Sequence, residues 1–273
     1  MNILIENIPT SRLFRFLRNS IYTISHFLEL IFPYHVPRII IFCYHSISSD
    51  GRRLSVKESE FKKQIDFLLK NYEPLRVSDI ETYMSGGKRL TRDAFILTFD
   101  DGYGNILTIK DFLKEQNIYP TAFVLSNNGN ANYRELDMPE GELLMQAEIM
   151  QLKEAGWEIG SHSSTHADFR CLTTDKIESE VRDSKDQLEY NLDIPIMYFA
   201  YPKGVYNSEV VGVVKKSGYK LAFSMDDGYI TSKDTNRFAL PRVGVDGTHT
   251  MKQFPYLGTP FSMFTRKLIK KFI

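Results

Sequence analysis

Short apolar runs that alternate with helical segments are the feature of this sequence that most restricts its fold. The runs occupy residues 38–45, 94–99, 121–125, 157–162, 197–202 and 220–224. Helix-like spacing of apolar residues follows the first run, at Phe61, Ile65, Leu68 and Leu69. Strands separated by helices of this length form right-handed βαβ units and pair in parallel. Because the runs are apolar throughout, the strands are expected to be covered on both faces.

Six or seven such units between residues 38 and 245 suit a barrel slightly smaller than the usual eightfold one. An open doubly wound sheet is the structural alternative. The 273 residues are enough for one domain with a full core. We therefore predict a single α/β domain over residues 38–248, with an extension at each end over residues 1–37 and 249–273.

Capping boxes predict where the first two helices begin. Ser55 and Glu58 have the required spacing at the start of one helix, and Ser78 and Glu81 have it at the start of the next. The second helix is expected to end at the glycine pair 86–87. Further helices are predicted over residues 106–116, 147–155, 174–190 and 207–217.

Both terminal extensions are basic and amphipathic. Arg12, Arg15 and Arg18 are spaced along one potential helical face, with apolar residues among them. The C-terminal segment 249–273 repeats this character with its lysines and phenylalanines. Such helices bind anionic membrane surfaces, which predicts peripheral association with a membrane. The alternative is that each end packs on the domain as a terminal helix.

The early apolar stretch from Ile21 to Phe32 does not have the character of a targeting segment. It is short, is interrupted by His26 and Glu29, and has no small-residue cleavage site. Neither a signal peptide nor a transmembrane helix is therefore expected. The default expectation is a cytoplasmic protein, located at the inner face of the cell membrane if its ends bind lipid.

The charge balance and the cysteines exclude several function classes. The chain has 34 basic and 34 acidic residues, so its formal net charge is zero, and a nucleic-acid partner is not expected. Its two cysteines, Cys43 and Cys171, form no CxxC or zinc-finger spacing. Cys43 lies inside an apolar run and is interpreted as a small buried hydrophobic residue.

Chemically reactive side chains gather where the predicted strands end. His45, the pair Asp100–Asp101, His162 and Lys203 each stand at the end of such a strand. The carboxyl ends of parallel strands meet at one side of the sheet, where functional residues collect. His166 follows His162 by four residues, so both imidazoles can converge on one cation. Two histidines and one carboxylate are the ligand set of hydrolytic zinc sites.

The motif TFDDGY at residues 98–103, followed by SHSSTH at residues 161–166, resembles the polysaccharide deacetylase family. This family is also called carbohydrate esterase family 4 or the NodB-homology domain, and the likeness covers residues 38–245. The resemblance implies a distorted (β/α)7 barrel that binds a divalent metal, commonly Zn²⁺. It also implies removal of acyl groups from sugars, typically the acetyl group of an N-acetylhexosamine.

Residue roles follow from the same resemblance. It implies that Asp100 is the general base and that Asp101, His162 and His166 are the metal ligands. A metal ion would lower the pKa of a bound water and relieve the repulsion between the two adjacent carboxylates. Asp100 could then accept the proton of the attacking water.

The third motif of the family is altered in YFAYPKGVYN, residues 198–207. Ala200 stands where the family has an arginine, and Lys203 replaces an aromatic residue. The backbone N–H of Lys203 can still serve the oxyanion. Arg242 is the candidate that replaces the missing arginine and orients Asp100; a surface salt bridge is the alternative for this residue.

The histidine expected in the last motif of the family is absent, and His249 matches its position poorly. His45, in FCYHSI at residues 42–47, is the better candidate for the general acid. It resembles a histidine in the branch of the family that acts on poly-N-acetylglucosamine. A hydrogen-bonded core histidine is the alternative interpretation.

Together these features predict a metal-dependent hydrolase that removes an N-acyl group from an amino sugar in a polysaccharide or lipid-linked glycan. The expected partner is a glycan or glycolipid. Two alternatives stay open. One is a barrel that binds carbohydrate but has lost catalysis, and the other is a deformylase or deacetylase of an undecaprenyl-linked sugar.

Overall fold

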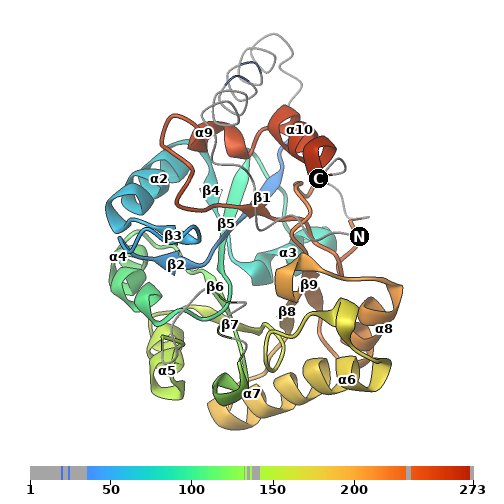
Figure 1. Cartoon of the computed structure of the whole chain (residues 1–273). Coiled ribbons are helices and arrows are strands. Elements are labelled where there is room, and N and C mark those ends of the chain that lie inside the picture. Colours follow the sequence, from blue (N-terminus) through green and yellow to red (C-terminus); the bar gives the residue numbers. More distant parts are fainter. Residues whose placement is uncertain are drawn as a thin grey trace.

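The computed structural model describes residues 20, 24, 36–131, 133, 136, 142–231 and 235–270. A curled parallel sheet forms the centre of the protein, and helices surround it (Figure 1). Its strands run in the order β10, β1, β5, β6, β7, β8, β9, with the short β4 added beside β5. Their bounds are β1 Ile39–Tyr44, β4 Glu73–Pro74, β5 Ala94–Phe99, β6 Thr121–Val124, β7 Glu158–Ser161, β8 Tyr198–Ala200, β9 Leu221–Phe223 and β10 Val243–Gly244.

The segment between β9 and β10 brings the two edges of the sheet towards each other. Leu240 pairs with Phe223 of β9 through a parallel bridge, and the Ser224 amide donates to the Leu240 carbonyl at 2.9 Å. Three residues later the chain enters β10, where Val243 pairs with Phe42 of β1. The sheet is therefore an incomplete barrel, as predicted, and not an open doubly wound sheet.

Successive side chains of each strand face opposite sides of the sheet. Along β1, Ile40 and Phe42 pack in the cluster under the outer helices, whereas Ile39 and Ile41 pack in the cluster that fills the barrel interior. Both faces are apolar because both are covered, which explains the uninterrupted apolar runs of the sequence.

The helices occupy the segments that the sequence predicts, with different starts for the first two. The helical elements are α2 Glu58–Asn71, α3 Val77–Met84, η1 Gly104–Ile109, α4 Lys110–Glu115, η2 Asn128–Asn130, α5 Gln146–Glu154, η3 Phe169–Cys171, α6 Thr174–Glu178, the π-helical turn η4 Ser179–Asp183, α7 Ser184–Leu192, η5 Pro202–Gly204, α8 Ser208–Lys216, α9 Phe254–Leu257 and α10 Pro260–Lys270.

The two predicted capping boxes are wrong. Ser55 belongs to the short strand β3 (Ser55–Val56), which pairs with β2 (Ser46–Ile47), and α2 has Lys57 at its N-cap. In α3 the N-cap is Arg76, whose amide donates to the Asp79 carboxylate at 2.8 Å. Serine is a good cap only when its backbone is free to take that position. Ser55 pairs in β3 instead, and Ser78 lies inside α3, where its amide and that of Val77 donate to the Glu158 carboxylate.

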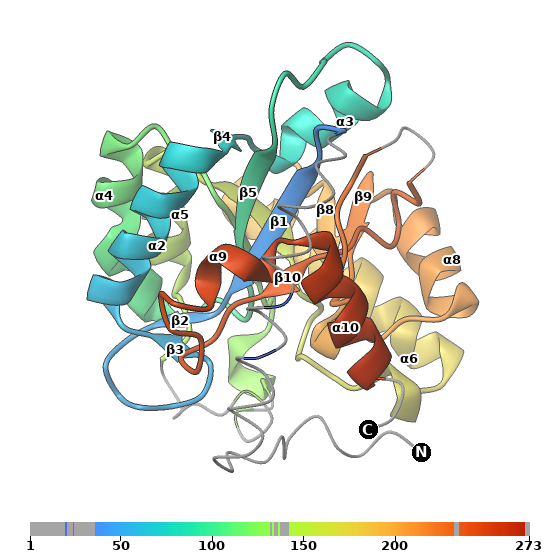
Figure 2. The same ribbon diagram turned by 90° about the horizontal axis from the view of Figure 1, so that it is seen from above.

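The C-terminal segment packs on the barrel as helices α9 and α10, which lie beside β1 and β10 in Figure 2. Met263 of α10 is buried, Phe264 is exposed, and Arg266 pairs with Asp227 at 3.0 Å. Apart from residues 20, 24, 36 and 37, the predicted N-terminal extension 1–37 lies outside the described residues. Within the described part of the chain, no helix has the length and apolarity needed to cross a membrane.

Candidate metal centre and active site

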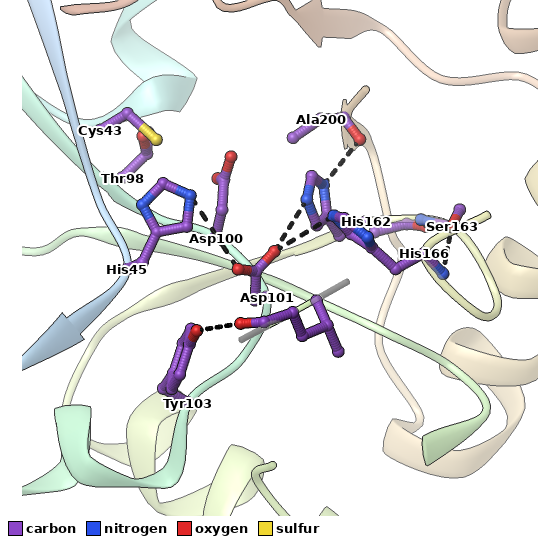
Figure 3. A network of polar contacts seen from close by, with 12 residues as sticks. Cys43, His45, Thr98, Asp100, Asp101, Tyr103, His162, Ser163, His166 and Ala200 are labelled. Carbon is purple, nitrogen blue, oxygen red and sulfur yellow. Dashed lines mark hydrogen bonds and ion pairs between the residues drawn. The ribbon is translucent and has the colours of Figure 1, made fainter. Parts of the chain in front are cut away.

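The carboxyl ends of β5 and β7 bring the two acids and the two histidines together (Figure 3). The Asp100 amide donates to the Tyr44 carbonyl at 2.9 Å, so the pairing of β1 with β5 continues past the end of β5. Asp101 then takes a positive φ of 69°, and the chain turns away from the sheet. The two adjacent acids therefore reach different partners.

Asp101, His162 and His166 form a buried cluster whose donor atoms face one another. Asp101 Oδ1 lies 3.2 Å from His162 Nε2 and 3.5 Å from His166 Nε2. Zinc ligands lie about 2.0–2.2 Å from the ion, so ligand atoms that share one zinc lie roughly 3–3.5 Å apart. The cluster has the spacing and the donor types of a divalent-metal site.

The hydrogen bond on the far side of the His162 ring supports the same assignment. Its Nδ1 lies 2.9 Å from the Ala200 carbonyl oxygen. A carbonyl can only accept, so Nδ1 carries the proton, and the Nε2 of neutral His162 presents a lone pair to Asp101. A lone pair that faces a carboxylate oxygen requires a positive charge between them, either a proton or a metal ion.

The electrostatics of the cluster also favour a cation. Burial alone would raise the pKa of Asp101, but the hydrogen bond with His162 and the surrounding imidazoles hold this pKa well below its usual value. Burial alone would lower the pKa of His162, yet the carboxylates of Asp100 and Asp101 raise it. Positive charge is therefore stabilised between the carboxylate and the imidazoles.

Asp100 is held by Arg242 through two hydrogen bonds. Arg242 Nη1 donates to Asp100 Oδ1 and Nη2 donates to Oδ2, both at 2.7 Å. Arg242 is fully buried, so the surface salt bridge considered for it does not occur. Burial alone would raise the pKa of Asp100, but the guanidinium outweighs it and keeps this pKa below the usual value. Asp100 is therefore ionised at neutral pH.

The position of Arg242 is itself fixed from several sides. Its Nε donates to the Ser224 carbonyl at 3.0 Å, and Nη1 also donates to Thr98 Oγ1 at 3.2 Å. The guanidinium carbon lies 5.5 Å from the centre of the Phe123 ring and 5.9 Å from that of Phe223. These contacts leave the guanidinium little freedom, so the orientation of Asp100 is set before any ligand arrives.

Comparisons with known proteins identify the family to which the chain is similar. Residues 87–222 match the family described as polysaccharide deacetylase. The chain has a polysaccharide deacetylase domain. It is therefore a hydrolase of the polysaccharide deacetylase type, as predicted.

Individual relatives support the assignment. The protein YxkH of Bacillus subtilis is 28% identical over 76% of this chain and 71% of its own length. The poly-beta-1,6-N-acetyl-D-glucosamine N-deacetylase of Staphylococcus aureus is 28% identical over 73% of this chain and 71% of its own length. The fold is similar to that of the Streptococcus pyogenes deacetylase PplD in complex with acetate, with a TM-score of 0.70, 21% identity and coverage of 83% of this chain and 100% of that one.

In this deacetylase domain His45 lies across the cluster from the histidine pair (Figure 3). Its Nε2 is 3.9 Å from Asp101 Oδ2, and its side chain is 16% exposed. The residue therefore borders the site and is not enclosed in the core. His249 lies elsewhere, with its Nδ1 3.1 Å from Asp246 Oδ1.

Lys203 stands at the end of β8 in the short helical turn η5, with a positive φ of 58°. Its Nζ lies 3.5 Å from Asp168 Oδ2, two residues beyond His166. The hydrogen bonds of Arg170 lower the pKa of Asp168 to about 2, although burial opposes this shift. The Lys203 ammonium group therefore lies near the ionised carboxylate of Asp168, beside the loop that carries His162 and His166.

Glu180 is a residue of the site region that sequence reasoning missed. Its carboxylate accepts the backbone N–H groups of Ser164 and Thr165 at 3.0 and 2.9 Å and the hydroxyl of Thr165 at 2.7 Å. These residues lie between the two histidines, in a loop where Ser163 and His166 have positive φ values of 70° and 62°. Nothing in the sequence near residue 180 indicates this contact, because it depends on how the helical connection after β7, which contains η4, packs against the loop that begins it.

Cys43 was also missed as a site residue, since it was interpreted only as a hydrophobic one. It is fully buried, as expected, but its partner in the sheet register is Thr98, which contacts Arg242. Burial raises the pKa of its thiol well above the usual value. The signal that could have found it is the spacing of two between Cys43 and His45, which puts both on one face of the strand.

Proposed function

We propose that this protein is a metal-dependent hydrolase that removes the N-acetyl group from an amino sugar within a glycan. The observation that carries the proposal is the pairing of a carboxylate held by an arginine with an adjacent Asp–His–His cluster. In such a site the metal ligands and the proton acceptor are different residues, which hydrolysis of an amide requires.

Asp101, His162 and His166 would hold the metal. Two imidazoles and one carboxylate leave coordination positions open, and this donor set suits Zn²⁺. A bound divalent cation supplies Lewis-acid activation of water and polarisation of the acyl oxygen. The fit rests on the converging donor atoms and on the His162 tautomer that the Ala200 carbonyl selects.

Asp100 is the proposed general base. Arg242 donates one hydrogen bond to each carboxylate oxygen of Asp100. The other lone pairs of these oxygens remain available to accept a proton from water. Its low pKa keeps it ionised, and the bidentate contact fixes its direction. Arg242 thus takes the place of the arginine that Ala200 replaces in the third motif.

His45 is the proposed general acid. It borders the cluster opposite the histidine pair and is partly exposed, so its imidazole can reach both solvent and a substrate. A proton from His45 would convert the departing sugar amine into a good leaving group as the tetrahedral intermediate collapses. The backbone N–H of Lys203 is proposed as an oxyanion donor.

The geometry favours an enzyme over a barrel that only binds carbohydrate. Burying an ionised carboxylate and a guanidinium together costs desolvation energy that binding of a sugar does not need. The pair Asp100–Arg242 is fully buried next to the metal cluster, where a base for hydrolysis must be. The relative that acts on poly-N-acetyl-glucosamine supports N-acetylglucosamine as the sugar.

Release of free amine from acetylated sugars tests the proposal. Zinc-loaded protein and its Asp100→Asn variant are incubated with chitooligosaccharides and with poly-N-acetylglucosamine, and primary amine and acetate are quantified. The wild-type protein is expected to release both products in equal amounts, and the variant is expected to release almost none. Equal inactivity of both proteins on every acylated sugar would contradict the proposal and favour the binding module.

A further inference from the structure

A second group of potential metal ligands lies directly beside the first. Donor atoms of Cys43, His45 and Asp100 all lie within 4.8 Å of one another. They share no residue with the Asp101–His162–His166 cluster, although Asp100 and Asp101 are neighbours in the chain. A thiol, an imidazole and a carboxylate at this spacing form a ligand set for zinc-like cations.

The strand geometry explains why these three side chains converge. Cys43 pairs with Thr98 in the β1–β5 register, so Cys43 and Thr98 lie side by side. His45 and Asp100 each follow two residues later along their strands, and side chains two residues apart point to the same face. The Cys43 thiol therefore lies on the same face of the sheet as His45 and Asp100, two residues further from the carboxyl ends of the strands.

We propose that Cys43, His45 and Asp100 form a second, inhibitory site for a soft divalent cation such as Cd²⁺ or excess Zn²⁺. The inhibitory effect rests on the proposed function, because it assumes that Asp100 is the base and His45 the acid. The binding itself does not depend on either role. A cation held here engages both residues at once, so neither can transfer a proton.

The identity of the cation follows from the thiol. Thiolate sulfur selects soft or borderline cations, whereas Mg²⁺ and Mn²⁺ prefer oxygen ligands. The cation forms a bond to sulfur as the thiol proton leaves for solvent, and no oxidant or reductant takes part. Cys43 is fully buried, but the partly exposed His45 provides the approach from solvent.

The neighbouring charges make this the weaker of the two sites. The guanidinium of Arg242 contacts both oxygens of Asp100 at 2.7 Å and repels a second cation. The Asp101 carboxylate instead has the imidazoles of His162 and His166 beside it, at 3.2 and 3.5 Å. We therefore expect the first equivalent of metal to fill the Asp101 cluster and only excess metal to reach Cys43.

Spectroscopy and inhibition test the site separately. The second cysteine is exposed, so the experiment uses a Cys171→Ser background to remove its thiol. This protein, loaded with one equivalent of Zn²⁺, is titrated with Cd²⁺ while sulfur-to-cadmium charge-transfer absorption and bound metal are measured. Deacetylation is followed in parallel under excess Cd²⁺, Zn²⁺ or Mn²⁺, relative to the activity of the same protein at one equivalent of zinc.

The expected result is a second bound cation, a charge-transfer band, and inhibition by Cd²⁺ and Zn²⁺ but not by Mn²⁺. Adding Cys43→Ala should abolish the band and raise the inhibitory concentration by at least roughly tenfold. A single bound cation with no band, or equal inhibition with and without Cys43, would overturn the proposal. The band and the stoichiometry are read on the Cys171→Ser protein alone, so they decide the matter even if the double variant does not fold.

Binding of a cation at the second site is decided independently of the proposed function. Metal stoichiometry and absorption need no substrate, so an inactive protein still answers the binding question. Conversely, activity at one equivalent of zinc without a second bound cation supports the proposed function and overturns the inhibitory site.

Discussion

Arg242 and Asp100 are 142 positions apart in the sequence, yet they meet through two hydrogen bonds of 2.7 Å in the interior of the barrel. The acid comes from the end of β5, and the arginine comes from the segment that leads into β10. Both strands flank β1 in the sheet, which is why the two side chains can meet across it. The orientation of the proposed base therefore depends on how the segment before β10 closes the barrel.

Replacing Arg242 should damage both activity and stability. Removing one partner of a buried ion pair costs about 3–5 kcal/mol, because the other charge stays buried. We expect Arg242→Gln to lower kcat/KM by roughly 10²-fold or more, since Asp100 loses its orientation. Urea unfolding and steady-state kinetics measure the two effects. Arg170→Gln, at an exposed pair with Asp168, is the matched control and should change stability by less than about 1 kcal/mol.

The same substitution should shift the acid limb of the pH–activity profile. Arg242 holds the pKa of Asp100 down against burial, so removing it leaves burial unopposed and raises that pKa. In the proposed mechanism the ionised form of Asp100 is the active one, so activity is lost as pH falls through its pKa. The acid limb of kcat/KM should therefore move to higher pH in Arg242→Gln. An unmoved limb would mean that Asp100 is not the group that titrates.

Removal of the metal should abolish activity and lower thermal stability together. A cation that binds only the folded protein stabilises it in proportion to the logarithm of its concentration. Chelation should therefore lower Tm in the wild-type protein and have little effect in His166→Ala. His249→Ala serves as the histidine control, because His249 pairs with Asp246 outside the cluster. A chelator-induced shift of equal size in His166→Ala would exclude this residue as a ligand.

Substitution of His45 should affect the chemical step more than substrate binding. A general acid contributes roughly 10²–10⁴-fold, so His45→Gln should lower kcat by that order while KM changes little. The measurement is kcat and KM across pH. A change confined to KM would assign His45 to substrate binding instead.

Glu180 should influence metal affinity without touching the metal. Its carboxylate fixes the loop between His162 and His166 through Ser164 and Thr165. Loss of such a supporting contact typically costs 10–100-fold in metal affinity, which competition with a chromogenic chelator can measure. We expect the full effect in Glu180→Ala and partial rescue in Glu180→Gln, whose amide oxygen still accepts. Asp175→Asn, an exposed carboxylate on the preceding helix, should change nothing.

The exposed face of α10 tests the predicted membrane association. Phe264 is 62% exposed and Lys267 is also exposed, whereas Met263 is buried against the domain. We propose that this face contributes to binding of anionic vesicles, and that Phe264→Ser with Lys267→Glu reduces flotation while leaving Tm nearly unchanged. Equal flotation of both proteins would remove α10 from the membrane hypothesis, and no flotation of either would reject it for the whole chain.

The sequence alone determined the architecture and the centre of the site. Continuous apolar runs separated by helices require a covered parallel sheet, and parallel strands present their ends on one side. Asp100 and His162 could be found because each stands where such a run ends, and Asp101 and His166 because they follow these two residues at spacings of one and four. The two pairs meet because β5 and β7 are parallel strands of one sheet with only β6 between them.

Only the tertiary structure decided how these residues are supported. Arg242 could be named from the sequence as a candidate, but burial and the bidentate contact depend on how the segment between β9 and β10 closes the barrel. Glu180 stands in a π-helical turn and contacts the loop between His162 and His166. Cys43 lies beside Thr98 because of the register between β1 and β5. The failed capping boxes have the same origin, because tertiary pairing overrides a local preference of about 1 kcal/mol. Contacts between distant segments follow from packing of the whole chain, which no local pattern records.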